Sequence, residues 1–384
     1  MTAPLLDPVD FTRLAAGGAW SLLTRRRGLP PPWPQLPQAA DKSLADLGLG
    51  EYLAEFQELL SEFFGLSPGP EAAATESLGH YARRLFEDWQ SGPAEIVFHS
   101  SGSTGRPKPC PHSQADLKQE IEAVARLFPT PARIISAAPL LHSYGFVFGL
   151  LLPKRLGLPA LSVVPLPGLL SAALAEGDLL LGFPWLLGQL AEAPAPRIQV
   201  LSSTAPCPEA LFTELPQKGF SGLAEIYGSS ETGAVAFRKT AAPFRLLDHW
   251  RCADGGFFRQ NKAGDVFYPQ LDHLDWADET HFRPAGRLDL AVQVGGVNVY
   301  PERVARLIEG EEGVREATVR LMSPEEGGRL KAFVVPEEGR DLALLRRSLS
   351  RVFRRLSPPE RPVSLSFGPE LPRGPAGKLC DWKI

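Results

Sequence analysis

The spacing of apolar residues predicts helices in the first 92 positions. Between residues 49 and 64, large apolar side chains recur every three or four positions, and the same spacing covers Leu78–Trp89. Apolar residues at this interval lie on one face of an amphipathic helix. We therefore expect the chain to begin with packed helices joined by loops.

From about residue 95 the pattern changes to short apolar runs separated by helical stretches. The runs are Glu95–Phe98, Arg133–Ala138, Leu179–Phe183, Ile198–Ser202 and Ala224–Tyr227. Continuous apolar runs of this length are typical of strands that are buried on both faces. Their alternation with helices predicts an α/β core.

A third pattern begins after Arg287. Short strands are expected at Leu290–Val294, Ala317–Leu321, Ala332–Val335 and Val363–Phe367, around helices at Pro301–Ile308 and Leu342–Leu356. This mixture is typical of a small α+β domain. The sequence therefore predicts a large N-terminal α/β domain over residues 1–288 and a small C-terminal domain over residues 289–384.

Composition narrows the class of protein. The 384 residues, 44% hydrophobic and 22% charged, suit a globular protein of two or three domains. A net charge of −4 provides no general attraction to nucleic acid. The four cysteines lie far apart and the first residues lack a signal peptide's basic and apolar regions, which favours reduced thiols and a cytoplasmic location.

One segment is long enough to test as a membrane span. Residues Ile134–Pro153 contain 20 positions without a charged side chain. Pro139 and the polar His142, Ser143 and Tyr144 interrupt it, whereas a membrane helix must satisfy every backbone group internally. We expect no membrane span here, but a buried strand, a turn and a helix.

A loop rich in hydroxyls and glycine follows the first predicted strand. Its sequence runs Ser100, Ser101, Gly102, Ser103, Thr104, Gly105, Arg106, Pro107 and Lys108. Flexible backbone amides, hydroxyls and one ammonium group form a cradle for a polyphosphate. The order of residues is not that of a Walker A loop. The alternative is a solvent-exposed turn, which does not need this density of hydroxyls.

Together with a second motif, Tyr227-Gly228-Ser229-Ser230-Glu231-Thr232, this loop resembles the adenylate-forming ligases, which include acyl-CoA synthetases, luciferases and the adenylation domains of peptide synthetases. The resemblance implies that Tyr227 stacks on adenine, Ser230 contacts the α-phosphate and Glu231 holds Mg²⁺. An aromatic face and a hard carboxylate oxygen suit a base and a hard cation. The segment Ser203-Thr204-Ala205 resembles the turn that lines the adenine and acyl pockets.

Further positions follow from the same resemblance. It implies that Asp272 binds the ribose hydroxyls, that Arg287 adds charge near the nucleotide, and that Asp289 is a hinge between the domains. In Pro372-Arg-Gly-Pro-Ala-Gly-Lys378, the family's lysine corresponds to Lys378, which stabilises charge during adenylation. His142 corresponds to a residue that flanks the acyl carboxylate. A solvated tail lysine, a loop acid and a core histidine are the alternatives.

Within this family the chain resembles compact bacterial 4-coumarate–CoA ligases of the kind that activates the chromophore acid of photoactive yellow protein. The phosphate loop lies near residue 100, which predicts a reduced N-terminal region. An aryl-propenoate substrate would require a slot of aromatic side chains, for which the candidates are Phe146, Phe148, Phe183 and Trp185. Gln293 stands where many relatives carry a second lysine.

The sequence thus predicts an AMP-forming acid–thiol ligase that uses ATP, Mg²⁺ and coenzyme A on a small carboxylic acid, such as 4-coumarate. Two alternatives stay open. One is an acyl-AMP ligase that loads an aromatic or fatty acid onto a carrier protein, and the other is a non-catalytic nucleotide-binding relative. Arginines at 346, 347, 351, 354 and 355 suit an acidic carrier or the phosphates of coenzyme A, or form a solvated helix face.

Overall fold

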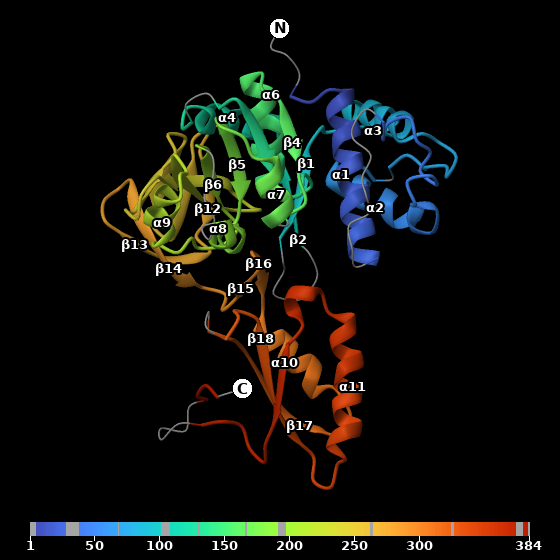
Figure 1. The fold of residues 1–384 in the computed structure, drawn as a ribbon, viewed down its shortest axis with the longest axis vertical. Coiled ribbons are helices and arrows are strands. Elements are labelled where there is room, and N and C mark those ends of the chain that lie inside the picture. Colours follow the sequence, from blue (N-terminus) through green and yellow to red (C-terminus); the bar gives the residue numbers. More distant parts are fainter. Residues whose placement is uncertain are drawn as a thin grey trace. The chain divides into compact units, whose positions relative to one another are not determined.

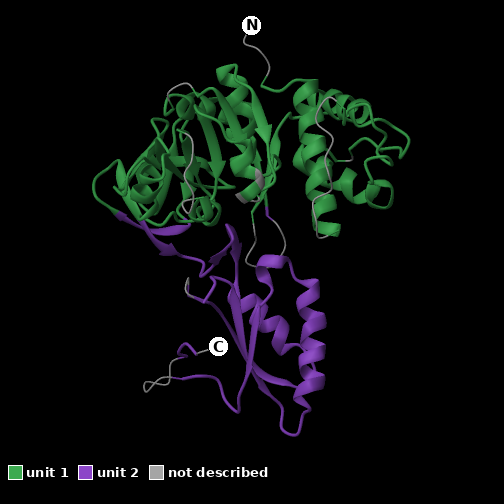
Figure 2. Cartoon of the chain, viewed as in Figure 1, with its two compact units in different colours: residues 1–100, 109–270, 276–283 green, residues 101–108, 271–275, 284–384 purple. Residues whose placement is uncertain are grey.

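The computed structural model describes residues 5–27, 38–67, 69–100, 108–128, 131–165, 167–190, 197–261, 264–323, 326–373 and 379–382. The chain forms two compact units (Figure 2). The first contains residues 1–100, 109–270 and 276–283, and most of the second lies in residues 284–384, together with 271–275. Each unit has its own hydrophobic core.

Three helices open the first unit, α1 (Pro8–Arg27), α2 (Leu53–Phe63) and α3 (Leu78–Ser91), and a short 3₁₀ helix (Gly50–Tyr52) precedes α2. They lie together at one side of the unit (Figure 1). Phe11 of α1 stacks on Phe64 with ring centroids 4.2 Å apart and contacts Trp89 of α3 at 5.4 Å. The helices predicted near residues 49–64 and 78–89 are therefore present, and their apolar faces pack against α1.

A nine-stranded sheet has the order β13-β14-β9-β8-β7-β6-β5-β3-β4, and its strands from β9 to β4 form the centre of the first unit. Strands β4, β3, β5, β6 and β7 are parallel, and β8, β9 and β14 continue the sheet in antiparallel pairs. The central strand β5 is buried at every position. The bounds are β3 (Arg133–Ser136), β4 (Ala160–Ser162), β5 (Asp178–Gly182), β6 (Gln199–Ser202), β7 (Gly222–Ser229), β8 (Gly233–Arg238), β9 (Phe244–Leu246), β13 (Asp272–Trp276) and β14 (His281–Arg287).

The remaining elements of this unit surround the large sheet or form smaller sheets. Strands β1 (Ile96–Ser100) and β2 (Lys108–His112) pair with each other, as do β10 (Trp250–Ala253), β11 (Gly256–Arg259) and β12 (Val266–Pro269). The helices are α4 (Gln114–Ala125), α5 (Ser143–Phe146), a π-helical turn (Val147–Leu151), α6 (Leu152–Leu156), α7 (Pro167–Ala173), α8 (Pro184–Leu190) and α9 (Leu211–Gln217).

The second unit is a three-stranded sheet with two helices. Strand β18 (Leu330–Pro336) pairs with β17 (Val314–Leu321) antiparallel and with β19 (Ser364–Phe367) parallel. Helices α10 (Pro301–Glu309) and α11 (Leu342–Arg355) bury Ile308 and Leu349 in the same cluster as Val334 of β18. A hairpin of β15 (Val292–Val294) and β16 (Val297–Val299) precedes them, and a 3₁₀ turn (Pro358–Glu360) follows α11.

The segment from Ile134 to Pro153 forms the predicted strand, turn and helix. Strand β3 ends at Ser136, and the chain turns through Pro139 before helical structure begins at Ser143. Among the helices of the described residues, none combines the length and apolar character of a membrane span.

Candidate active site

The predicted site residues of the first unit follow parallel strands of the large sheet. His142 follows β3, Ser203-Thr204-Ala205 follows β6, and the motif from Tyr227 to Thr232 ends β7. Because β3, β5, β6 and β7 are parallel, their carboxyl ends lie at one edge of the sheet. Open α/β sheets bind their ligands at this edge.

Hydrogen bonds join neighbouring loops along this edge. The Tyr144 hydroxyl, two residues after His142, donates to the Leu201 carbonyl of β6 at 2.7 Å. The Ser203 hydroxyl donates to the Ile226 carbonyl of β7 at 3.2 Å. Thr204 has a φ of +76°, a strained conformation for a β-branched residue that the surrounding structure must enforce. The segment 203–205 is thus held against β7 beside Tyr227.

The turn that carries Ser230 and Glu231 is closed by its own hydroxyls. The Ser229 amide donates to Thr232 Oγ1 at 3.1 Å, and the Glu231 amide donates to Ser229 Oγ at 3.2 Å. Thr232 is buried, whereas Ser230 and Glu231 are half-exposed. The residues that close the turn are therefore different from those predicted to bind phosphate and metal.

Glycine is required on both sides of this turn. A Cβ atom on Gly228 would lie 2.1 Å from the Gly233 carbonyl oxygen, at the register shift between β7 and β8. Gly233 has a φ of +70°, and a Cβ there would lie 2.4 Å from a Glu120 carboxylate oxygen. Tyr227 precedes this tight region, with its ring edge-on to Phe282 at 5.1 Å. The Tyr227 ring also lies 5.8 Å from the Phe244 ring, at an interplanar angle of 56°.

The hairpin β1–β2, whose strands precede and follow the phosphate-loop segment, contacts the same turn. Ser100 ends β1 and Lys108 begins β2, so the two strands flank the loop, while Ser101, Gly102, Ser103, Thr104 and Gly105 lie outside the described residues. His112 of β2 donates from Nε2 to the Ser230 carbonyl at 2.7 Å. The Ser230 hydroxyl donates to the His99 carbonyl of β1 at 3.4 Å. The strands that flank the first motif are therefore bonded to the second, although the two are far apart in sequence.

Glu231 fits the predicted Mg²⁺ role. Magnesium at nucleotide sites is usually held by one or two carboxylates together with substrate phosphates. Glu231 is half-buried beside Ser230, and no described side chain donates a hydrogen bond to its carboxylate. Within the described ranges, no group of three or more His, Cys, Asp or Glu side chains is arranged to hold a metal ion. A single carboxylate in a turn that is predicted to contact phosphate suits a metal that arrives with its nucleotide.

Sequence reasoning missed a buried ion pair beneath the 203–205 segment. Arg238 of β8 donates to Glu225 of β7 at 2.7 Å, and the Glu225 carboxylate also accepts the Cys207 amide at 2.8 Å. Arg238 further donates to the Cys207 carbonyl at 3.2 Å. Both side chains are buried, and burial raises the pKa of Glu225 although Arg238 opposes the rise. The available signal was one acidic residue inside the apolar run Ala224–Tyr227.

Glu120 of α4 supports the same turn from beneath. It is buried, and its carboxylate accepts the Ala234 amide at 2.8 Å. Complete burial raises its pKa to about 7, against the opposing effects of Arg259 and the Ala234 amide. Because its other carboxylate oxygen has no hydrogen-bond partner in the described structure, ionisation of this group is costly.

This environment predicts that Glu120→Gln changes how stability depends on pH. A raised pKa means that Glu120 favours the folded state below pH 4.5, and that this contribution is lost as pH rises through about 7. At pH 8 we expect the free energy of unfolding of Glu120→Gln to exceed that of wild type by about 3 kcal/mol. At pH 4 we expect the two free energies to be equal. Urea unfolding across this range measures both. Glu122→Gln, an exposed carboxyl on the same helix, is the control, and an unchanged pH slope in Glu120→Gln would contradict the assignment.

His142 lies immediately before α5. Its Nδ1 accepts the Tyr144 amide at 3.3 Å, which leaves Nε2 as the proton-bearing nitrogen. The side chain reaches solvent, yet enough protein surrounds the ring for desolvation to lower its pKa. His142 is therefore a neutral donor at the carboxyl edge of the sheet. It is not hydrogen-bonded to any other predicted site residue of the described chain.

Asp272, Arg287 and Asp289 lie together in the second unit. Arg287 donates to both Asp289 oxygens at 2.9 and 2.6 Å, and its Nε lies 3.9 Å from Asp272. Burial alone would raise the pKa of Asp289, but hydrogen bonds from Arg287, the Ala291 amide and Tyr300 outweigh it and lower the pKa.

The residue after Asp289 has an unusual backbone. Leu290 has a φ of +59° and is 68% exposed, although large side chains rarely adopt a positive φ. Strain of this kind persists where a structure needs a particular backbone geometry. The hinge role of Asp289 stays a prediction.

Lys378 lies outside the described residues, but the chain on both sides of it is anchored. Arg373 and Leu379 form an antiparallel bridge, and the Cys380 amide donates to the Pro372 carbonyl at 3.0 Å. Lys331 of β18, fully buried, donates to the Trp382 carbonyl at 2.7 Å. The described chain before and after this segment is therefore anchored by hydrogen bonds.

The four candidate aromatic residues divide into two pairs. Phe146 and Phe148 are buried, and Phe146 contacts Phe63 and Phe98 in the core. Phe183 and Trp185 follow β5 at the carboxyl edge of the sheet and stack at 6.3 Å with an interplanar angle of 13°. Trp185 is 57% exposed.

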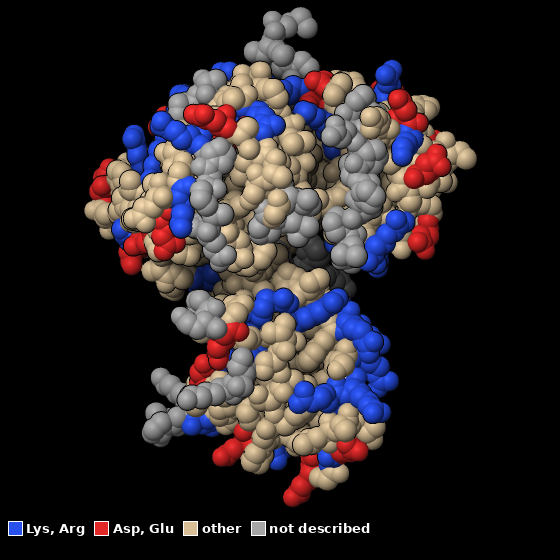
Figure 3. Space-filling view, in the orientation of Figure 1, with Lys and Arg blue, Asp and Glu red and all other residues tan. Residues whose placement is uncertain are grey.

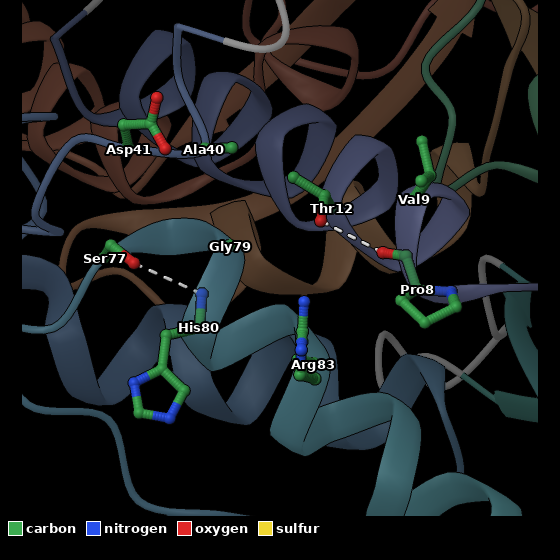
Figure 4. A pocket seen from close by; sticks show the side chains of 9 residues that line it. All are labelled: Pro8, Val9, Thr12, Ala40, Asp41, Ser77, Gly79, His80 and Arg83. Atoms are coloured by element: carbon green, nitrogen blue, oxygen red, sulfur yellow. Dashed lines mark hydrogen bonds between the residues drawn. The ribbon is translucent and has the colours of Figure 1, made fainter.

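A cavity of about 500 Å³ lies elsewhere, at the beginnings of α1 and α3 (Figure 4). Figure 4 shows Ser77 accepting the His80 amide as the N-cap of α3, with Arg83 one turn further on. None of the predicted site residues lines it. The lining residues are Pro8, Val9, Thr12, Ala40, Asp41, Ser77, Gly79, His80 and Arg83. This cavity is therefore separate from the candidate active site.

Known proteins are similar to this chain in sequence and in fold. The AMP-binding enzyme family matches residues 88–255. A 4-coumarate–CoA ligase of Halorhodospira halophila is 38% identical over 314 residues, which cover 80% of this chain and 80% of that protein. A 4-coumarate–CoA ligase of Rhodobacter capsulatus is 38% identical over 302 residues, 76% of this chain and 77% of that protein.

Among solved structures, the amide bond synthetase McbA of Marinactinospora thermotolerans has a TM-score of 0.60 at 21% identity, over 74% of this chain and 67% of that chain. The o-succinylbenzoate CoA synthetase of Bacillus subtilis has a TM-score of 0.59 at 19% identity, with the same coverage. At these identities the likeness concerns the fold.

The chain belongs to the AMP-binding enzyme family. It is an AMP-forming acid–thiol ligase, as the motifs predicted, and the predicted α/β fold with a smaller α+β part is confirmed. Ligases of this class use ATP and coenzyme A as substrates and Mg²⁺ as a cofactor.

Proposed function

We propose that this enzyme joins 4-coumarate, or a closely related aryl-propenoate, to coenzyme A through an acyl-adenylate. The names of the relatives from Halorhodospira halophila and Rhodobacter capsulatus support this substrate, because both proteins are similar to this chain over more than three quarters of its length.

We also propose a cytoplasmic location, with which four cysteines outside any disulfide agree.

The observation that carries the substrate proposal is the stacked aromatic pair of the half-buried Phe183 and the exposed Trp185. Its stacked rings follow β5, beside the segment 203–205 that follows β6. A planar aryl-propenoate stacks well on such a surface, since aromatic side chains combine large contact area with few rotatable bonds. A saturated fatty acid would gain less from it.

The reaction follows from the chemistry of the proposed residues. A carboxylate oxygen attacks the α-phosphorus of ATP, the bond to the β-phosphate oxygen breaks, and pyrophosphate leaves. Ser230 contacts the α-phosphate, Glu231 holds Mg²⁺ with the phosphates, and Lys378 offsets the negative charge that develops. The neutral His142 donates a hydrogen bond to the carboxylate. The thiol then attacks the acyl carbon, AMP leaves, and the thiol proton passes to solvent.

A carrier protein is a second candidate acceptor, because α11 presents a basic face. Its five arginines at 346, 347, 351, 354 and 355 are exposed, and within the described residues none forms an ion pair with a carboxylate. Figure 3 shows Lys and Arg side chains gathered over the part of the second unit where α11 lies. Such a face suits an acidic protein surface or the phosphates of coenzyme A.

Carboxylate-dependent exchange between pyrophosphate and ATP tests the substrate. The panel contains 4-coumarate, other cinnamates, benzoates, and short and long fatty acids, each with Mg²⁺. We expect the largest kcat/KM with 4-coumarate, and a KM for 4-coumarate raised about tenfold in Trp185→Ala. A preference for a fatty acid would contradict the substrate proposal. Thioester formation with free coenzyme A, compared with a phosphopantetheine-loaded carrier protein, separates the two acceptors.

A further inference from the structure

His112 is a buried residue that no motif of the sequence singled out. It lies on β2 and is 3% exposed, with its ring against Phe98 at 5.1 Å. Its Nε2 lies 2.7 Å from the Ser230 carbonyl oxygen, 118 positions along the chain. A carbonyl oxygen only accepts, so this contact fixes the proton on Nε2.

The position of this bond matters for the turn. The Ser230 carbonyl belongs to the peptide that joins Ser230 to Glu231, so the bond orients the peptide between the two residues proposed to contact phosphate and Mg²⁺. The Ser230 hydroxyl contacts the His99 carbonyl of β1 at 3.4 Å. Both strands of the hairpin are therefore bonded to Ser230, β2 through its carbonyl and β1 through its hydroxyl.

The charged groups near His112 do not compete for its proton. Burial lowers its pKa and Arg259 of β11 acts in the same direction, while the hydrogen bond to the Ser230 carbonyl, Asp116 of α4 and Glu231 oppose them without reversing the shift. The net result is a ring that is neutral near pH 7, with one N–H directed to the Ser230 carbonyl. A neutral donor orients the peptide without placing a positive charge beside the metal site.

We propose that His112 is a positioning residue, which holds the Ser230–Glu231 peptide in register with the phosphate-loop hairpin so that the site for Mg·ATP is preorganised. The inference rests on the function proposed for this site. His112 itself contacts neither the reacting atoms nor the nucleotide. Its effect passes through the peptide bond that it orients, and misplacement of a binding group by about 1 Å can cost on the order of 10²-fold in rate.

The test compares His112→Gln with His112→Asn and His112→Phe. A glutamine side-chain nitrogen reaches about the position of Nε2, whereas asparagine is shorter and phenylalanine has no donor. In pyrophosphate exchange we expect His112→Asn and His112→Phe to require at least fivefold more Mg²⁺ for half-maximal rate and to lose about 10–100-fold in kcat/KM for ATP. We expect His112→Gln to stay within threefold of wild type, and the KM for 4-coumarate to change little in all three.

His249→Phe is the matched control. His249 is also a buried histidine of the first unit near Arg259, but neither ring nitrogen has a hydrogen-bond partner among the described residues. A purely structural role for His112 would lower stability and leave the Mg²⁺ dependence unchanged, which would overturn the proposal. So would equal losses in His112→Gln and His112→Asn. Where His112→Phe does not fold, the comparison of Gln with Asn decides.

Binding of Mg·ATP by calorimetry separates this inference from the proposed function. If wild type shows no exchange with any acid, the proposed function fails, but weaker Mg·ATP binding in His112→Asn than in His112→Gln still supports the positioning role. If wild type is active and both variants bind Mg·ATP as it does, the positioning role fails while the proposed function stands.

Discussion

Lys378→Ala is expected to slow adenylation by about 10²–10³-fold while Mg·ATP still binds. The ammonium group is proposed to offset charge on the α-phosphate as the carboxylate attacks, so its removal raises the energy of the transition state more than that of the bound substrates. Pyrophosphate exchange measures the rate, and calorimetry measures nucleotide affinity.

Lys383→Ala provides the control for Lys378, because it removes the other lysine near the end of the chain. We expect its exchange rate to equal that of wild type. Adenylation at the wild-type rate in Lys378→Ala would remove the role assigned to this lysine. A loss of Mg·ATP binding equal to the loss of rate would instead indicate a binding role.

Arg238→Ala is expected to lower the free energy of unfolding by about 3–5 kcal/mol. Its guanidinium is the ion-pair partner of Glu225, and both groups are buried. Its removal leaves the Glu225 carboxylate buried, and among the described residues the Cys207 amide is then its remaining partner. The 203–207 segment would lose its hydrogen bond from Arg238 as well. Urea unfolding at pH 7 measures the change.

Arg251→Ala is the matched control for Arg238. Arg251 forms an exposed ion pair with Asp265, with side chains 55% and 39% accessible, and we expect its removal to cost less than about 1 kcal/mol. The double variant Arg238→Met with Glu225→Gln should recover most of the stability, because it removes both buried charges. Equal losses in Arg238→Ala and Arg251→Ala would contradict the account of the buried pair.

The order of the elements was predictable wherever the hydrophobic pattern was strong. The apolar runs that predicted β3, β5, β6 and β7 lie in the parallel part of the large sheet, which is buried on both faces. The strands between residues 233 and 287 were not predicted. Several are short or half-exposed, such as β12 with its largely exposed Val266–Pro269, and they show neither a continuous apolar run nor a regular alternation.

The buried residues that hold the site in place were less predictable than the residues of its motifs. Tyr227, Ser230 and Glu231 stand in one short segment that a family pattern marks. His112 and Glu120 reach the same turn from β2 and α4, through bonds to backbone atoms at Ser230 and Ala234. Contacts between a side chain and a distant backbone group leave no pattern in a single sequence. For Glu225, a charge inside an apolar strand was the available sign.

The central claim is that the carboxylate is activated as an acyl-adenylate, and isotope transfer tests it most directly. The enzyme is incubated with Mg·ATP, coenzyme A and 4-coumarate whose carboxylate oxygens are ¹⁸O, and the nucleotide and phosphate products are analysed by mass spectrometry. Attack of the carboxylate on the α-phosphorus transfers one ¹⁸O atom to AMP, which leaves when the thioester forms. We expect one ¹⁸O in AMP and none in pyrophosphate. Label in inorganic phosphate together with ADP would show an acyl phosphate instead and would contradict the claim.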